Sequence, residues 1–315
     1  MGNNTKVIMV DNKIKELMCE FYKDMKRDKT PPYALFQADT GDTVVTLYSS
    51  GKAMFQGVAA DIEAGMWESI KKDDSIIEDF SDEGSRPSKK KVETSIEMNI
   101  SSIGSDEVGT GDYYGPIVVT ASYVSKDDIA FLTELGVRDS KKISDEQILK
   151  IVPKIIKRIP YKSIMLSNKD YNDNYGSNMN LNKIKAVLHN KVLSQMVNEG
   201  NYVFDYVVID QFEPEKSYYN HLSEVVNPLK GITFITKAED KCLSVAVSSL
   251  ISRYIFIKEM DKLGDKYGMF LPKGANYYVE DIGIKLVQKY GESVLHDVAK
   301  LNFANTGRIL KEVRK

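Results

Sequence analysis

The chain has 315 residues, of which 42% are hydrophobic and 28% charged, and its formal net charge is -2. These proportions are typical of a soluble globular protein, and the charge neither requires nor excludes a polyanionic partner. The two cysteines, Cys19 and Cys242, exclude a disulfide framework and a zinc-site spacing. No apolar signal core and no run long enough to span a membrane occurs. We therefore expect a cytoplasmic protein, a monomer, with no membrane partner.

The first 72 residues predict a small α+β domain with an antiparallel sheet. Short β-type runs separated by glycine-containing turns indicate strands, and apolar residues at three- and four-residue steps indicate helices. Asn12 is the predicted cap of the first helix, which we expect to reach about Arg27. The predicted strands are 5–10, 33–38, 43–48 and 52–56, and the second helix is 59–70.

Residues 73–97 differ in composition from both flanking regions, and we interpret them as a charged linker. Residues 73–85 contain six acidic residues and no basic one, and a run of three lysines follows at 89–91. The lysine run is interpreted first as part of a solvated tether. Occasional contact with a phosphate backbone is the alternative.

Residues 98–315 alternate between strand and helix patterns, which predicts an α/β domain with a mixed central sheet flanked by helices. Runs of apolar residues lead into polar turns that contain acids, and this pattern recurs along the domain. The expected strands are 99–105, 114–124, 161–166, 204–210 and 232–236, and the expected helices are 126–135, 144–158, 180–199, 214–226, 241–263 and 279–290.

Two adjacent carboxylates, Asp106 and Glu107, follow one such run and precede the glycines of a turn at 109–111. Neighbouring residues of a strand face opposite sides of a sheet, so both acids can serve one site only near a strand end or a distortion. The glycines supply such an end. Carboxylates at a strand end suit Mg²⁺, which takes oxygen ligands and keeps several waters.

Further acids lie at comparable places in the chain. Asp210 ends the apolar run 206–209, where ligands of open α/β sheets gather, although a helix N-cap is an equal alternative. Glu239 and Asp240 follow the last predicted strand, and spacing alone does not choose between them. Three acidic ends on one sheet are what a two-metal phosphodiester hydrolase needs.

The motifs carry a resemblance to a known family. The sequence GSDEVGTGDYYGP at 104–116 resembles the signature of ribonuclease HIII, a bacterial type 2 ribonuclease H. The N-terminal phrase LYSSGKAMFQG at 47–57 resembles the extra domain of that family, which is similar to half of a TATA-box-binding protein. Further matches follow in family order: RDSKK at 138–142, LHN at 188–190, IDQF at 209–212, TKAE at 236–239 and SSLISRY at 248–254.

The resemblance implies a ribonuclease H-like fold and a catalytic, metal-binding set of four carboxylates: Asp106, Glu107, Asp210 and Glu239. Glu239 is selected over Asp240 because it occupies the family's position after Lys-Ala. The implied reaction is cleavage of the RNA strand of an RNA·DNA hybrid with Mg²⁺ or Mn²⁺, which leaves 3′-hydroxyl and 5′-phosphate ends. Glutamate at 239 and the Gly-Thr-Gly sequence at 109–111 favour the HIII branch over ribonuclease HII.

Substrate contacts follow from the same motifs. Gly109, Thr110 and Gly111 can approach a ribose 2′-hydroxyl, the group that separates RNA from DNA. The phosphate contacts that we expect are Ser140, Lys141 and Lys142 in a turn before a helix, and Lys52 in a hairpin of the N-terminal domain. Two alternatives stay open: HII-like cutting at a single embedded ribonucleotide, and hybrid binding without catalysis.

Overall fold

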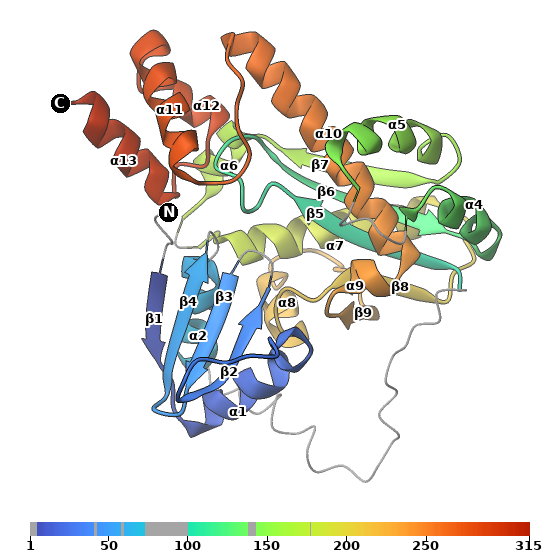
Figure 1. The fold of residues 1–315 in the computed structure, drawn as a ribbon. Coiled ribbons are helices and arrows are strands. Elements are labelled where there is room, and N and C mark those ends of the chain that lie inside the picture. Colours follow the sequence, from blue (N-terminus) through green and yellow to red (C-terminus); the bar gives the residue numbers. More distant parts are fainter. Residues whose placement is uncertain (1–4, 41–42, 58–59, 73–99, 138–142, 177) are drawn as a thin grey trace. The chain divides into compact units, whose positions relative to one another are not determined.

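The computed structural model describes residues 5–40, 43–57, 60–72, 100–137, 143–176 and 178–315 (Figure 1). They fall into two compact units, one within Met1–Glu93 and the other within Thr94–Lys315. The predicted linker at 73–97 lies outside the described residues. The predicted boundaries at 72 and 98 therefore stay a prediction.

The N-terminal unit is a four-stranded antiparallel sheet in the order β1-β4-β3-β2, with helices packed on it, as the sequence predicted. Its first helix differs in its ends. Asp11, not Asn12, is the cap and accepts a hydrogen bond from the Ile14 N–H at 2.9 Å. The helix ends at Phe21 because Lys26 already pairs with Ala38 at the sheet edge. The elements are β1 (Thr5–Met9), α1 (Asn12–Phe21), a 3-10 turn (Lys23–Met25), β2 (Ala34–Asp39), β3 (Thr43–Tyr48), β4 (Lys52–Gly57) and α2 (Ala60–Lys72).

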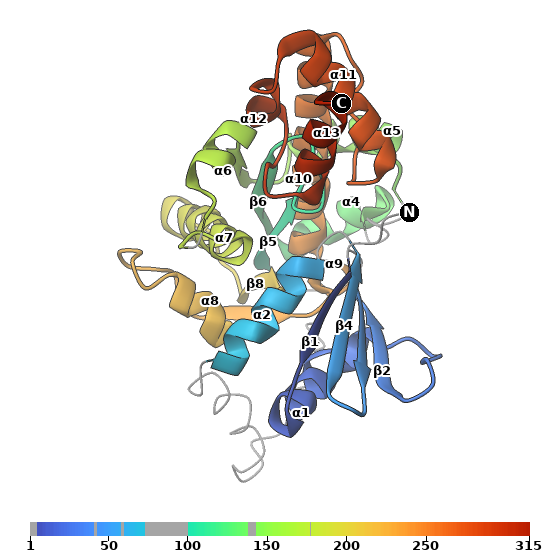
Figure 2. The same ribbon diagram turned by 90° about the vertical axis from the view of Figure 1, so that its left-hand side faces the viewer.

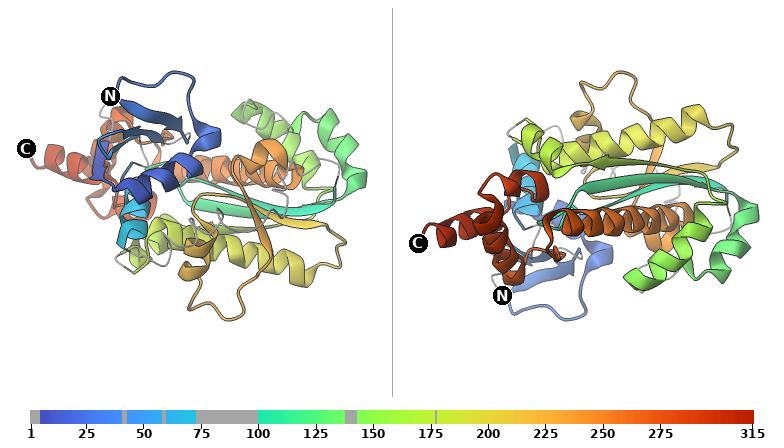
Figure 3. Two further views of the ribbon diagram at one scale, coloured as in Figure 1. Left: turned by 90° about the horizontal axis from the view of Figure 1, so that it is seen from below. Right: turned by 90° about the horizontal axis from the view of Figure 1, so that it is seen from above.

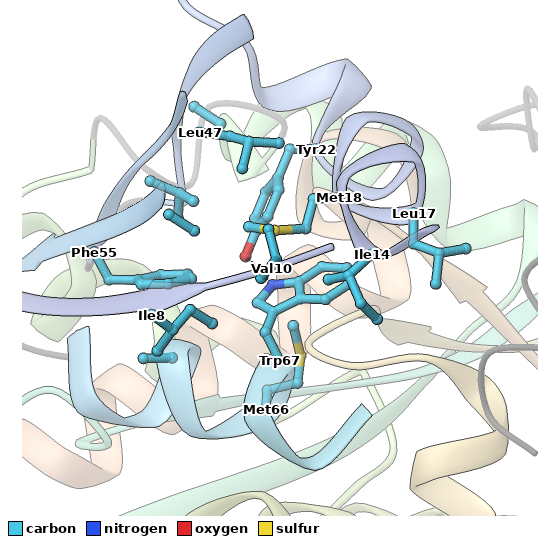
Figure 4. Packing of buried hydrophobic residues seen from close by; sticks show 14 of the residues in the cluster. Ile8, Val10, Ile14, Leu17, Met18, Tyr22, Leu47, Phe55, Met66 and Trp67 are labelled. Carbon is cyan, nitrogen blue, oxygen red and sulfur yellow. Dashed lines mark hydrogen bonds between the residues drawn. The ribbon is translucent and has the colours of Figure 1, made fainter. Parts of the chain in front are cut away.

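The core of this unit is built around Tyr22 and Trp67, which are both fully buried (Figure 4). The Trp67 indole N–H donates to the Tyr22 hydroxyl at 2.7 Å, and that hydroxyl donates to the Glu63 carboxylate at 2.5 Å. Apolar side chains from the sheet and from both helices surround the pair. The relay therefore gives two polar groups their partners inside an apolar core.

The C-terminal unit contains the predicted mixed sheet, in the order β7-β6-β5-β8-β9. Strands β7, β6 and β5 pair antiparallel, while β5, β8 and β9 run parallel. The carboxyl ends of three neighbouring parallel strands therefore meet at one end of the sheet. The strands are β5 (Ser102–Val108), β6 (Ile117–Val124), β7 (Tyr161–Leu166), β8 (Tyr206–Asp210) and β9 (Ile232–Ile235).

Two long helices cover the sheet, α7 (Leu181–Glu199) on one face and α10 (Leu243–Tyr267) on the other (Figure 3). Two groups of helices pack against α10 in separate apolar clusters, and the second group lies at the C-terminal end of α10 (Figure 2). The first group is α4 (Ile129–Glu134) and α5 (Asp145–Ile155), and the second is α11 (Tyr277–Tyr290), α12 (Val294–Val298) and α13 (Ala304–Val313). No helix of the described segments is both long and apolar enough to cross a membrane.

The element ends differ from the predicted ones where the backbone is interrupted. The strand predicted from 114 begins at Ile117, because Gly115 has a φ of +82° and Pro116 has no N–H to donate. The helix predicted over 241–263 is α10, which begins at Leu243 because Cys242 has an extended φ of -133°. The short helix α9 (Ala238–Lys241) before it was not predicted. The predicted helix 126–135 starts as a 3-10 turn, and α6 (Asn168–Asn174), α12 and α13 were not predicted.

Tyr22→Phe is expected to destabilise the N-terminal unit by about 1–3 kcal/mol, because it removes the buried hydroxyl that accepts from Trp67 and donates to Glu63. Trp67 is the only tryptophan, so its fluorescence in a urea titration of the full chain reports on this unit. Tyr33→Phe is the control, since Tyr33 is 86% exposed. Equal midpoints for the two variants would contradict the proposed relay.

Candidate active site

Asp106 and Glu107 lie in β5, near its carboxyl end, rather than beyond it. The strand keeps its pairing with β6 as far as Val108, but its pairing with β8 ends at the match of Ser105 with Ile209. Both acids are thus past the end of the sheet on the β8 side only. This one-sided ending replaces the simple strand end that the sequence predicted.

The two side chains obey the alternation of a strand and face opposite helices. Asp106 faces α10, where the Ser249 side chain hydrogen-bonds to it. Glu107 faces α7, and its Oε2 lies 2.9 Å from His189 Nε2. A backbone contact also joins the acids, because the Glu107 N–H donates to Asp106 Oδ1 at 2.9 Å. The site therefore reaches around the end of the sheet.

Asp210 and Glu239 arrive from the next two strands. Continuing the parallel register of β5 and β8 by one residue brings Asp210 beside Asp106. Asp210 Oδ1 accepts a hydrogen bond from the Ala238 N–H at 2.9 Å, which ties the end of β8 to the start of α9. Lys237 makes this possible by adopting a left-handed φ of 54°, and Glu239 follows on the same short helix. The structure thus brings together all four predicted carboxylates.

The carboxylates share one electrostatic environment. Burial raises the pKa of Asp106 well above its ordinary value, and the charges of Glu107 and Asp210 raise it further. Burial raises the pKa of Asp210 to about 7, with a further contribution from Glu239. These shifts are what converging like charges produce when water is removed from around them.

Glu107 behaves differently because it has cationic and hydrogen-bonding partners on α7. Burial alone would raise its pKa, but the Lys185 ammonium and His189 hold it well below the ordinary value. Lys185 Nζ lies 2.5 Å from Glu107 Oε1, and the His189 ring reaches on to Ser105 Oγ at 2.8 Å. Among the described residues, no three His, Cys, Asp or Glu side chains form a group ready to hold a metal ion. Both Glu107 oxygens have partners, Lys185 at Oε1 and His189 at Oε2.

Lys185 and His189 were not predicted as site residues. His189 lies in the LHN match at 188–190, and a spacing of four residues puts it on the same helix face as Lys185; these were the available signals. The same spacing occurs on many solvated helix faces. Only the packing of α7 over β5 distinguishes the two cases.

A ladder of buried hydroxyl groups fixes α10 against β5 and β6. Ser248 Oγ donates to the Gly104 carbonyl at 2.8 Å, and Ser252 Oγ donates to the Asp106 carbonyl at 3.2 Å. Close approach is possible because Gly104 has no Cβ, which would lie only 2.5 Å from Ser244 Oγ. These hydrogen bonds therefore fix the position of Asp106 relative to α10.

The glycine turn after β5 is also held from inside. Gly109 has a φ of +91°, and a Cβ there would lie 2.1 Å from the Pro116 carbonyl oxygen, so the turn requires glycine. Lys300 is fully buried and its ammonium donates to the carbonyls of Asp112 and Gly115 at 2.8 and 2.6 Å. The turn at 109–111 is thus a rigid, partly exposed edge next to the carboxylates.

The structure says less about the residues predicted to contact phosphates. Ser140, Lys141 and Lys142 lie outside the described residues. Lys52 is exposed at the start of β4, in the N-terminal unit, with its ammonium 6.0 Å from the centre of the Tyr48 ring. Its contact with a phosphate stays a prediction.

Comparison with protein families gives two matches. A family model described as Ribonuclease HII matches residues 103–306, which include all four carboxylates. A second model, described as a domain of unknown function (DUF3378), matches residues 5–77. Together the two models cover both compact units.

Named relatives and solved structures agree with these matches. Ribonuclease HIII of Geobacillus kaustophilus is 38% identical over 309 residues, which are 96% of this chain and 97% of that protein. The crystal structure of Bst-RNase HIII in complex with Mn²⁺ matches with a TM-score of 0.69 at 36% identity, over 99% of this chain and 100% of that one. Aquifex aeolicus RNase H3 shares the fold, with a TM-score of 0.54 at 20% identity over 95% of this chain and 100% of that one.

Asp210→Asn is expected to stabilise the metal-free protein at pH 7.5 by at least about 1 kcal/mol, and to have little effect at pH 4. The folded pKa of about 7 lies above the ordinary value, so the wild type loses stability as the pH rises from about 4 to 7. Asparagine does not titrate and keeps an oxygen for the Ala238 N–H.

Thermal melts in EDTA across this pH range measure the difference. Asp261→Asn, at an exposed position of α10, is the matched control and is expected to show no such trend. A pH-independent difference for Asp210→Asn would contradict the raised pKa.

Proposed function

We propose, because this chain belongs to the ribonuclease HIII family, that it hydrolyses the RNA strand of RNA·DNA hybrids. The family makes it an endonuclease of the ribonuclease H kind. The observation that carries the proposal is the convergence of Asp106, Asp210 and Glu239 at the carboxyl ends of three parallel strands. Such a set of acids has no evident structural use, since their mutual repulsion destabilises the fold.

Divalent cations fit the chemistry of these residues. The four side chains offer only carboxylate oxygens, which are the ligands of Mg²⁺ and Mn²⁺. Burial, and after it the charges of the neighbouring acids, raises the pKa of Asp106 and of Asp210, and bound cations would offset both effects. The related Bst enzyme, with 36% identity, has been crystallised with Mn²⁺. We propose that Asp106 and Asp210 anchor the ions and that Glu239 completes their shell.

When bound, two such ions stabilise the attacking and leaving oxygens of a phosphodiester. The chain's own groups hold the reacting strand in place. A water oxygen bonds to phosphorus and the bond from phosphorus to the 3′-oxygen breaks, which leaves a 3′-hydroxyl and a 5′-phosphate. Glu107, kept ionised by Lys185 and His189, is suited to orient a group near the ribose.

Selectivity for RNA is assigned to the turn Gly109–Thr110–Gly111. A hybrid presents its 2′-hydroxyls in an open minor groove, where backbone groups can reach them. Thr110 and Gly111 are partly exposed in this turn, so their backbone N–H and C=O groups are available to a ribose. The N-terminal unit, through Lys52, would add phosphate contacts that weaken with salt.

The proposed setting follows from the same residues. All four carboxylates come from one chain, so a monomer suffices for the site. Both cysteines are free, which fits the reducing cytoplasm where hybrids form.

Asp106→Asn and Glu239→Gln are each expected to lower cleavage of a labelled RNA·DNA hybrid at least about a hundredfold, because each removes a charge from the set. Gel electrophoresis with Mg²⁺ and with Mn²⁺ measures the products and their ends. Asp240→Asn, next to Glu239, is the matched control and is expected to cleave like the wild type. Full activity of Asp106→Asn would refute the site. An inactive wild type in both metals would refute the function.

A second substrate tests the branch of the family. A uniform hybrid is expected to be cut efficiently, and a DNA duplex with a single embedded ribonucleotide poorly, when both are run side by side. The opposite ranking would indicate HII-like specificity. Hybrid binding without any product in either metal would indicate a binding protein instead.

A further inference from the structure

Lys185 is the one cation seen to contact the carboxylates among the described residues, and it lies inside the site rather than on its rim. Its ammonium is 2.5 Å from Glu107 Oε1, and both side chains are only 12% exposed. The charges of Asp210 and Glu213 also act on it, after that of Glu107. Its ammonium lies 4.0 Å from the centre of the Phe212 ring, which fixes the side chain from another side.

We infer that Lys185 is an internal counter-cation of the carboxylate site, which stabilises the metal-free state and competes with the divalent cation. This inference rests on the proposed function in one respect only, that the carboxylates bind a divalent metal. It assigns to Lys185 a role opposite to that of a ligand: its positive charge lowers metal affinity.

Because the pair of Lys185 and Glu107 is buried, the charge of Lys185 has a large effect on the free energy of the site. An exposed ion pair contributes little, but a charge left alone in a buried site is costly. A lysine carries its positive charge at neutral pH, and Lys185 holds that charge against the Glu107 carboxylate. Without it, the metal-free site would hold four acids with His189 as the nearest other partner of Glu107.

The geometry also implies competition for one oxygen. His189 occupies Glu107 Oε2 and is itself held by Ser105, whereas Lys185 occupies Oε1 through a flexible four-carbon chain. A metal that binds Glu107 Oε1 therefore has to displace the Lys185 ammonium or share that oxygen with it. Even a metal bound only to Asp106 and Asp210 is repelled by it through space.

Glu213 is a further acid whose charge acts on Lys185. It is 2% exposed, and its Oε2 lies 3.2 Å from His221 Nε2, while its Oε1 has no hydrogen-bond partner among the described atoms. A buried acid of this kind adds negative potential around Lys185. The charges of Glu107, Asp210 and Glu213 therefore all attract the ammonium.

Isothermal titration of the full-length metal-free protein with Mn²⁺, without nucleic acid, tests the inference. Lys185→Met is expected to lower the Kd about tenfold, since one nearby positive charge is removed from a partly buried site. Lys185→Arg keeps the charge and is expected to bind Mn²⁺ like the wild type. Lys183→Met removes a charge from the same helix, where Lys183 pairs with Glu224, and is expected to change the Kd little.

An unchanged or higher Kd for Lys185→Met would overturn the inference, because a residue that merely positions Glu107 or binds the metal shell gives that result. A similar gain for Lys183→Met would overturn it as well. If Lys185→Met does not fold, a looser Kd for Lys185→Arg in place of an unchanged one would count against it. Hybrid cleavage by the wild type is scored separately, so failure of the proposed function and failure of this inference are distinguishable.

Discussion

Repulsion among four carboxylates at one end of a sheet is the constraint on which the C-terminal unit depends. Burial removes the water that would screen these charges, so their energy rises steeply as they approach. The protein meets this in two ways. Asp106 and Asp210 tend toward protonation, as their raised pKa values indicate, whereas Glu107 stays ionised beside Lys185. Glu107 thus differs from Asp106 and Asp210 in having a cationic side chain beside it.

Holding these carboxylates close together requires surrounding strands and helices that are firmly bonded to one another. The Ser248 and Ser252 hydroxyls bind β5 carbonyls directly, and the Ala238 N–H binds Asp210. These are hydrogen bonds between buried groups, which are costly to break. The left-handed backbone at Lys237 is the kind of local strain that persists where surrounding contacts enforce it. The repulsion among the acids thus lowers the stability of the fold, and the hydrogen bonds around the site offset this loss.

Part of this arrangement could be predicted from the sequence, where acids follow apolar runs, and the family resemblance supplied the full set of four. Asp106 and Asp210 end apolar runs, and parallel neighbours bring such ends together whatever the loops do. Spacing could not choose between Glu239 and Asp240, since a single turn of helix decides which one faces the sheet. Lys185 was not predicted as a site residue because a charged residue on a long helix is usually solvated. Its role appears only when α7 packs over β5.

The glycine turn and the acids form one mechanical unit, which bears on how RNA is selected in the function we propose. Gly109 follows Asp106 by three residues, so their Cα atoms can be no more than about 10 Å apart. Lys300 hydrogen-bonds the carbonyls of Asp112 and Gly115 just after the turn, and Gly109 packs closely against Pro116. A ribose that engages the turn therefore brings its own phosphodiester to the carboxylates. A deoxyribose lacks the hydroxyl for that contact, so recognition and cleavage depend on the same rigid strand.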